Sequence, residues 1–273
     1  SADFKLTEFN RPANGTPGLA PVTGPNAGEV LSSFSTGLRQ IWGLAYNPMA
    51  GDLWIQDLQS LDFYVEDNRL VRFGIDGVNS GDQIISTSEM NASSDLAFNP
   101  LTGTLWQTGK NSCIYELDLG SRQATGNMIC LPGNGPETLA FDPLTNTYLA
   151  SRIDTNTPGS SFIYRFTPQG EILASGKVNL RIEAMTYNPD TGHLFAVTGS
   201  NSIYMIDAAT FGQIGFLFSP YDPYNYLNGI DMDCNGSLWA TDTGYTQKVY
   251  EIASGESGVC DWMKIPWLSV SPT

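Results

Sequence analysis

The stretch LAYNPMAGDLW at residues 44–54 recurs in altered form four more times along the chain. The other copies are LAFNPLTGTLW at 96–106, LAFDPLTNTYL at 139–149, MTYNPDTGHLF at 185–195 and IDMDCNGSLW at 230–239. Their starts lie 52, 43, 46 and 45 residues apart, a period typical of β-propeller blades built from short strands. We therefore predict an all-β propeller of five blades, each with four antiparallel strands.

Each copy of the motif predicts a hairpin of two inner strands. A short apolar strand comes first, and proline or a following polar residue then opens a turn, because proline fixes φ and donates no hydrogen bond. One position of the turn holds only residues that accept a positive φ, namely Gly51, Gly103, Asn146, Gly192 and Gly236. The motif then ends on the returning strand, whose tryptophans at 54, 106 and 239 recur in phase with the blades and are expected in the core.

Alternating segments after each motif predict a third strand, at 70–73, 114–117, 163–166, 203–206 and 249–252. Outer fourth strands begin at 170–173 and 212–215, and the N-terminal segment GEVLSSF at 28–34 resembles the first of them. We expect this N-terminal strand to close the last blade beside 248–252, which leaves no open seam. In the alternative, residues 259–263 form the fifth outer strand and the N-terminal strand belongs to an incomplete sixth blade. Five blades are preferred because a sixth would have no copy of the motif.

The four cysteines fit this strand map. Cys113 and Cys130 lie about equally far from a turn at 120–121, and Cys234 and Cys260 are expected at the same face of the last blade. Two disulfides, Cys113–Cys130 and Cys234–Cys260, are therefore predicted, and they imply a secreted or cell-surface protein. A zinc site is disfavoured, because the chain has one histidine and no Cys-x-x-Cys pair.

The formal net charge is −15, from 13 basic and 28 acidic residues. Such a balance argues against nucleic acid as a partner, and the sequence holds no apolar run long enough for membrane insertion. We expect a monomer with a Pro- and Gly-rich linker or wrapping segment at 1–27, the propeller at 28–264, and the start of a linker to a following module at 265–273.

Polar side chains two residues before each motif are expected to form a ring at one mouth of the central channel. The ring consists of Trp42, Ser94, Glu137, Glu183 and Asn228. Its two carboxylates need compensation, because like charges in a narrow channel repel each other and lose hydration. Calcium, Arg181 or ordered water would each provide it.

The segment LNGIDMDCNGSLW at 227–239 resembles blades of the gluconolactonase (senescence marker protein) and NHL-repeat propellers. In the gluconolactonase family, Glu, Asn and Asp at such strand starts hold a catalytic divalent metal. The resemblance implies a metal, with calcium as the candidate, at Glu137, Glu183 and Asn228. The catalytic Asp of that family is not matched, since Asp95 falls one residue away from the ring. The tail IPWLSVSPT resembles the opening of immunoglobulin-like modules that follow propellers in large bacterial secreted proteins, including some subtilase-type peptidases. It implies covalently linked neighbouring domains.

Aromatic and polar residues gather in the loops expected around that mouth. Rings that stack and polar groups that orient suit a neutral sugar or a peptide, although the same rings could instead pack the loops on one another. His193 lies in a turn on the opposite face and is predicted to be a solvated turn residue rather than a base. The sequence thus favours a noncatalytic binding module, with a calcium-dependent gluconolactonase-like hydrolase as the alternative. The candidate ligand-binding residues are Trp42, Asp62, Tyr64, Tyr221, Tyr224, Tyr226 and Tyr245.

Overall fold

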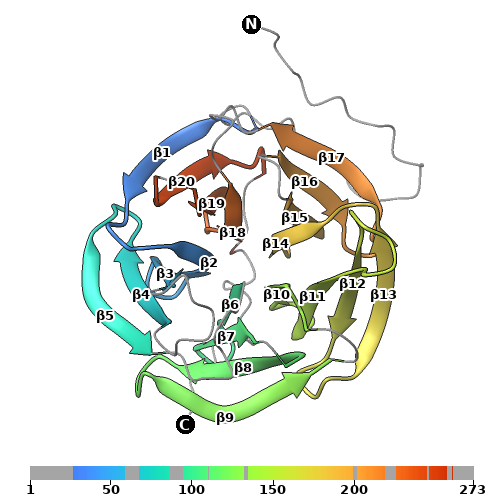
Figure 1. Cartoon of the computed structure of the whole chain (residues 1–273), viewed down its shortest axis with the longest axis horizontal. Coiled ribbons are helices and arrows are strands. Elements are labelled where there is room, and N and C mark those ends of the chain that lie inside the picture. Colours follow the sequence, from blue (N-terminus) through green and yellow to red (C-terminus); the bar gives the residue numbers. More distant parts are fainter. Residues whose placement is uncertain are drawn as a thin grey trace, which may run out of the picture.

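The chain folds into a ring of five four-stranded antiparallel sheets (Figure 1), as the repeat predicts. This description rests on a computed structural model. The described residues are 27–58, 68–85, 95–109, 111–131, 135–198, 202–218, 226–244, 246–256 and 260. No helix long and apolar enough to cross a membrane occurs in these ranges.

Four blades are continuous in sequence and run from the channel outward. Blade one holds β2 (Ile41–Asn47), β3 (Asp52–Asp57), β4 (Arg69–Gly74) and β5 (Asn79–Ile85). Blade two holds β6 (Leu96–Asn99), β7 (Thr104–Thr108), β8 (Cys113–Asp118) and β9 (Gln123–Cys130). Blade three holds β10 (Thr138–Asp142), β11 (Thr147–Ile153), β12 (Ser161–Phe166) and β13 (Ile172–Val178). Blade four holds β14 (Ile182–Asn188), β15 (His193–Thr198), β16 (Ser202–Asp207) and β17 (Gln213–Phe218).

The two ends of the chain close blade five together. Its inner strands are β18 (Leu227–Met232), β19 (Ser237–Asp242) and β20 (Lys248–Ala253), and its outer strand is β1 (Val30–Ser35) from the N-terminal side. β1 pairs antiparallel with β20, with Phe34 opposite Val249, so β1 lies outside β20 in the ring (Figure 1). The predicted N-terminal closure is confirmed, and the described residues form five blades rather than six.

The inner hairpins share one register. The second residue of the motif pairs with the aromatic or leucine residue that ends it, as in Ala45 opposite Trp54 and Asp231 opposite Trp239. The predicted turn position has a positive φ in all five copies, with values from 51° at Asn146 to 85° at Gly236. The repeat therefore specifies both the strands and the left-handed turn residue between them.

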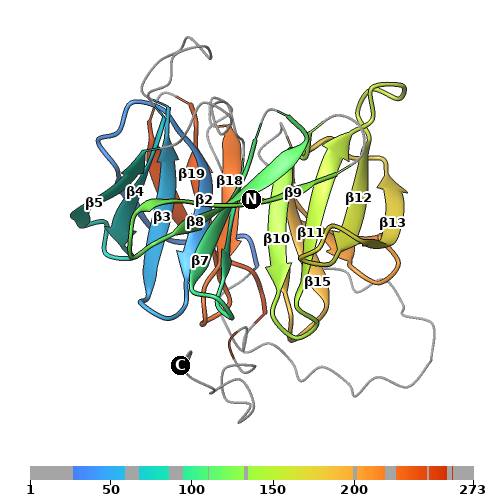
Figure 2. The same ribbon diagram turned by 90° about the horizontal axis from the view of Figure 1, so that it is seen from below.

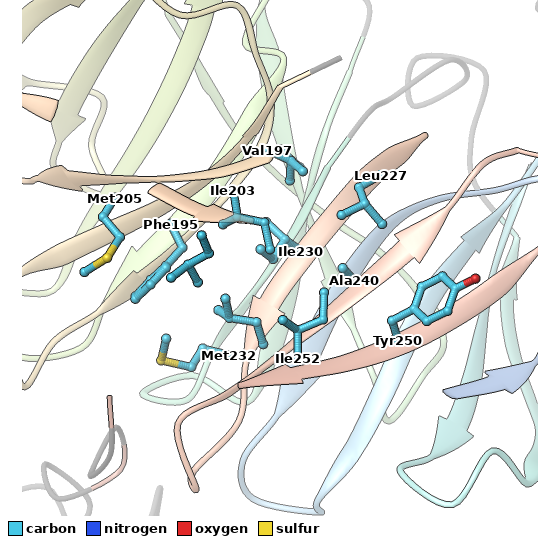
Figure 3. Close-up of a cluster of buried hydrophobic side chains, with 13 residues drawn as sticks. Phe195, Val197, Ile203, Met205, Leu227, Ile230, Met232, Ala240, Tyr250 and Ile252 are labelled. Carbon is cyan, nitrogen blue, oxygen red and sulfur yellow. The ribbon is translucent and has the colours of Figure 1, made fainter. Parts of the chain in front are cut away.

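The core lies between neighbouring blades rather than in one central mass. Between blades four and five, Phe195, Val197 and Ile203 meet Ile230 and Ile252 (Figure 3). Trp54, Trp106 and Trp239 are 3%, 6% and 2% exposed, so their predicted place in the core is confirmed. Because each blade buries both faces against its neighbours, the position of every inner strand is set by the two blades beside it.

Both predicted disulfides are present. Cys113–Cys130 joins β8 to β9, and Cys234–Cys260 joins the inner turn of blade five to the chain beyond β20. Residues 1–26 and 265–273, which carry the predicted linkers at the two ends, lie outside the described residues.

Candidate functional site at the upper mouth of the channel

The first strand of each blade lines the central channel (Figure 1), and β2, β10 and β18 are seen from the side in Figure 2. We call the end where these strands begin the upper mouth, and the end with the inner hairpin turns the lower mouth. Inner strands have a free edge, whose N–H groups need acceptors when they are buried. The way in which the chain supplies those acceptors determines the shape of the channel.

Two aspartates cross the channel and accept hydrogen bonds from the inner strands of other blades. Asp95 accepts from its neighbour Leu96 at 3.0 Å, from Leu139 of blade three at 3.0 Å and from Met185 of blade four at 3.3 Å. Asp95 is fully buried, and burial raises the pKa of its carboxyl well above the usual range, against the lowering effect of these bonds. Asp95 therefore holds three channel walls together.

Asp231 also accepts hydrogen bonds from other blades, at a position nearer the lower mouth. Its carboxylate accepts from the Tyr46 N–H of blade one at 2.7 Å, the Thr186 hydroxyl of blade four at 2.6 Å and the Met232 N–H at 2.8 Å. Burial is the main cause that raises the pKa of Asp231 to about 6, and the negative charge of Asp233 adds to it. All five blades are thus tied through two carboxylates.

The upper mouth departs from this regular wall, because three inner strands carry an extra residue where they begin. The pairing shifts by one residue between Ile41 and Leu44, between Ile182 and Ala184, and between Leu227 and Ile230. These β-bulges contain Trp42, Glu183 and Asn228, three members of the predicted ring. A bulge re-aims a side chain and is common beside functional sites. These three ring residues are therefore displayed by local departures from the sheet.

Gly229 lets the Asn228 bulge lie against blade one. A Cβ atom at this position would lie 2.3 Å from the Trp42 carbonyl oxygen and 2.7 Å from the Leu44 nitrogen, so only glycine fits. Thr241 completes the contact, since its hydroxyl accepts from the Gly229 N–H at 2.7 Å and donates to the Trp42 carbonyl. Asn228 is thereby held next to Trp42, with 4% of its surface exposed.

The bonds of Gln247 support the strand that carries Trp42. Its side-chain oxygen accepts from the Ile41 N–H at 2.8 Å, while its nitrogen donates to the carbonyl of Gly244. Glu137 is placed by the first bond of its hairpin, in which the Glu137 N–H donates to the Ser151 carbonyl at 2.8 Å. Trp42 and Glu137 are thus positioned by hydrogen bonds to their supporting strands, one from the Gln247 side chain and one between backbone groups.

The acidic part of the mouth carries its own cation. Arg181 Nε lies 2.7 Å from Glu183 Oε1, and the Tyr226 hydroxyl bonds the same carboxylate. Burial first, and the charge of Glu183 second, raise the pKa of Glu137, while Arg181 opposes the rise. Burial and Glu183 likewise raise the pKa of Tyr226. Glu137, Glu183, Arg181 and Tyr226 therefore form one electrostatic group.

Oxygen donors of this kind suit a hard cation such as calcium. Among the described residues no cluster of three His, Cys, Asp or Glu side chains is arranged to hold a metal, and the predicted set of two glutamates and an asparagine, which is not of that kind, stays a prediction. Arg181 supplies one positive charge to Glu183 directly. Compensation by Arg181, one of the options predicted from the sequence, is therefore present in the structure.

The structure brings together only part of the predicted ligand site. Tyr226 lies at the acidic group and Trp42 beside Asn228, and both are partly exposed. The other candidates, Asp62, Tyr64, Tyr221, Tyr224 and Tyr245, lie outside the described residues, as does Ser94 of the ring.

The expectation for His193 is wrong. It is the first residue of β15 with only 10% of its side chain exposed, and its Nδ1 contacts the Glu256 carboxylate. Glu256 also accepts from Asn188 at 2.6 Å and Thr191 at 2.8 Å. His193 thus anchors the segment after β20 to blade four instead of facing solvent.

Reasoning from the sequence missed the roles of Asp95, Asp231 and Gly229. One signal was available for Asp231, because the other four copies of the motif have Ala or Thr at its position. A carboxylate in a strand that is otherwise apolar indicates a buried polar role. Asp95 and Gly229 lie outside the motif, and their roles depend on which strands the ring brings together.

No known protein family and no curated protein matches the sequence. Among solved structures, the chain is similar to glutaminyl cyclase from Myxococcus xanthus, with a TM-score of 0.60 and 14% identity. The match covers 82% of this chain and 94% of the cyclase. At this identity the likeness supports the propeller fold. It lends no support to the expected resemblance to gluconolactonase and NHL-repeat proteins.

Proposed function

We propose that this chain is a noncatalytic binding propeller, a monomeric module of a secreted multidomain protein, and that its upper mouth binds a sugar or a peptide. The observation that carries the proposal is Asn228 Oδ1, a buried acceptor with no hydrogen-bond partner among the described residues. Leaving such a group unpaired costs about 1–3 kcal/mol, which a donor on a ligand would recover. The two disulfides support a secreted protein.

The upper mouth favours ligands that donate hydrogen bonds. Its acceptors are the unpaired Asn228 oxygen and the carboxylates of Glu137 and Glu183. Hydroxyls of a sugar, or N–H groups of a peptide, are the matching donors. Trp42 and Tyr226 add partly exposed rings for the apolar faces of such a ligand.

Titration calorimetry with cellotriose and with triglycine tests this proposal. Binding of either probe should weaken about tenfold in Asn228→Ala, as expected for loss of one buried hydrogen bond. Asn179→Ala removes an exposed asparagine from the connection before β14, at the same end of the ring, and should bind like the parent. If neither probe binds, or if both variants bind alike, the ligand site is not at this mouth.

A catalytic role is the second candidate, and it rests on Glu137. A half-buried carboxyl whose pKa is raised by burial is a candidate group for taking up and returning a proton. The activity named for the solved neighbour, glutaminyl cyclase, would use such a group. The amino nitrogen of a terminal glutamine would bond to its side-chain amide carbon, the C–NH2 bond would break, and Glu137 would pass the amine's proton to the departing ammonia.

Mass spectrometry distinguishes catalysis from binding. A Gln-Phe-Ala peptide incubated with the protein should lose one ammonia if the chain is a cyclase, and Glu137→Gln should stop the loss. A peptide that remains unchanged while triglycine binds at Asn228 would leave the binding module as the function.

The alternative hypothesis, a calcium-dependent gluconolactonase-like hydrolase, makes a different prediction. Calcium at Glu137, Glu183 and Asn228 would stabilise the fold by about 2.7 kcal/mol at a hundredfold excess over Kd. Adding calcium to chelator-stripped protein should then raise Tm, and the Glu137→Gln, Glu183→Gln double variant should lose the rise. We expect no rise, because Arg181 already pairs with Glu183.

A further inference from the structure

The lower mouth holds a cavity that the proposed function does not use. Its volume is about 60 Å³, and its rim carries one proline from each of blades one to four: Pro48, Pro100, Pro143 and Pro189. In blade five the motif has Cys234 at the proline position, and its disulfide partner Cys260 completes the rim. The cavity is therefore built by all five copies of the repeat.

Aromatic side chains and one carboxylate line this cavity. Tyr46, Phe98, Phe141 and Tyr187 occupy the third position of the motif in blades one to four, and Asp231 lies among them. Among the described residues of the lining, Asp231 is the one carboxylate. A negative charge surrounded by ring faces is the combination that attracts an organic cation.

The charge of Asp231 has no cationic partner among its hydrogen bonds. All three donors to it are neutral, from two backbone N–H groups and one hydroxyl. Among the described residues, the titratable groups with a leading influence on its pKa, or whose own pKa its charge affects, are Asp233, Asp95 and Tyr46, none of them basic. A buried carboxylate without a counter-charge gains from a cation placed beside it.

The rim already holds one cation on an aromatic ring. The Arg165 guanidinium lies 5.4 Å from the centre of the Tyr187 ring and is paired with Asp142 at 2.6 Å. Because Asp142 neutralises Arg165, that guanidinium does not compensate Asp231.

We infer that the lower mouth is a second binding site, which takes the end of an alkylammonium group such as a lysine side chain or a methylated amine. The ammonium lies beside the Asp231 carboxylate, and its alkyl part contacts the rings of Tyr46 and Tyr187 and the side chain of Met232. The cavity is small, at about 60 Å³, and it suits the end of an alkylammonium chain. This site is at the opposite end of the channel from Asn228 and stands independently of it.

The test uses the full chain with ¹³C-labelled methionine methyl groups, with the Met232 signal assigned through Met232→Leu. At about pH 7.5, where Asp231 is ionised, n-butylammonium should shift the Met232 signal and 1-butanol, its neutral match, should not. Asp231→Asn should abolish the shift. An equal response to butanol, a shift that survives in Asp231→Asn, or no shift with either probe would overturn the site.

A second pair of variants keeps the test decisive if Asp231→Asn fails to fold. Tyr46→Phe retains the ring and should bind as the parent does, whereas Tyr46→Leu removes it and should weaken binding about threefold. Equal affinity of the Tyr46→Phe and Tyr46→Leu variants would show that the aromatic ring does not contribute to binding. Lys264→Gln tests the source of the cation, since Lys264 lies four residues after Cys260 and outside the described residues. Tighter butylammonium binding in that variant would assign the cavity to the chain's own lysine and overturn an external ligand.

Discussion

The two mouths of the channel are formed by the ends of the same five strands, yet they differ in how closely they follow the repeat. At the lower mouth the same motif positions supply prolines and aromatic rings in four of the five blades. At the upper mouth three strands carry bulges, and the side chains displayed there are an indole, two carboxylates and an amide. Positions inside the repeat thus build one mouth, whereas departures from it build the other. Both mouths depend on the aspartates that tie the strands between them.

The largest loss of stability is expected when one of the aspartates that tie the inner strands together is removed. Asp95→Ala leaves three N–H groups without their acceptor, and we expect it to lower the free energy of unfolding by about 4 kcal/mol or to prevent folding. Asp76→Ala, at an exposed turn of blade one, should cost less than about 1 kcal/mol. Urea unfolding measures both. Similar losses in the two variants would show that Asp95 does not hold the channel walls.

The two disulfides provide the next comparison, because one lies at each end of the ring. Cys113–Cys130 spans 17 residues and Cys234–Cys260 spans 26, so replacing either pair by serine should cost about 3 kcal/mol. Only the second pair borders the lower cavity. Thermal melting should therefore fall comparably in both variants, while the Met232 methyl signal should move in the Cys234→Ser, Cys260→Ser protein alone. A Met232 signal that is unchanged in both double-serine variants would show that the Cys234–Cys260 disulfide does not shape the cavity.

The dependence of stability on pH distinguishes Asp95 and Asp231, whose pKa values are raised, from Asp154, whose pKa is lowered. The pKa of Asp231 is about 6 in the fold against a usual 3.8, so the folded protein holds this proton more tightly than the unfolded chain. The stabilisation is fully present below about pH 4 and is lost as the pH rises through about 6, with a size of at most about 3 kcal/mol. Asp95 acts in the same direction.

The ion pair of Asp154 and Lys177 affects stability in the opposite direction with pH. Lys177 is the first cause that lowers the pKa of Asp154 to about 2, so stability from this group is lost as the pH falls through that value. We therefore expect the highest Tm in mildly acidic buffer, below neutral pH. Asp231→Asn should flatten the profile between about pH 4 and 7, and a parent protein that is most stable above neutrality would contradict the assignment.

The fold was predictable from the sequence because the repeat specifies local structure five times over. The turn residues, the buried tryptophans, the disulfide pairs and the closing strand β1 all follow from aligning the copies with one another. His193 was misjudged because its partner Glu256 is 63 residues away, beyond the reach of any local pattern.

The site was less predictable, for a related physical reason. The ring of Glu137, Glu183 and Asn228 could be located by counting back from the motif, and Arg181 could be named as a possible counter-charge. The bulges at Glu183 and Asn228 could not be predicted from the sequence, since a bulge depends on how a strand pairs with its neighbour. The aromatic loop residues, including Tyr64 and Tyr221, stay predictions because they lie outside the described residues.

The smallest effect is a matched pair of pKa changes at the upper mouth. Glu183 raises the pKa of Glu137 and Arg181 lowers it, so Glu183→Gln should lower that pKa and Arg181→Gln should raise it. Arg181 is 57% exposed, so loss of its ion pair should change unfolding by less than about 1 kcal/mol. Carboxyl ¹³C NMR titration of Glu137 reads the two shifts directly. Arg165→Gln at the lower rim is the control, because Arg165 acts on Asp142 and Tyr187. Shifts of the same sign in the two upper-mouth variants would mean that Arg181 and Glu183 act on Glu137 by moving the strand rather than through their charges.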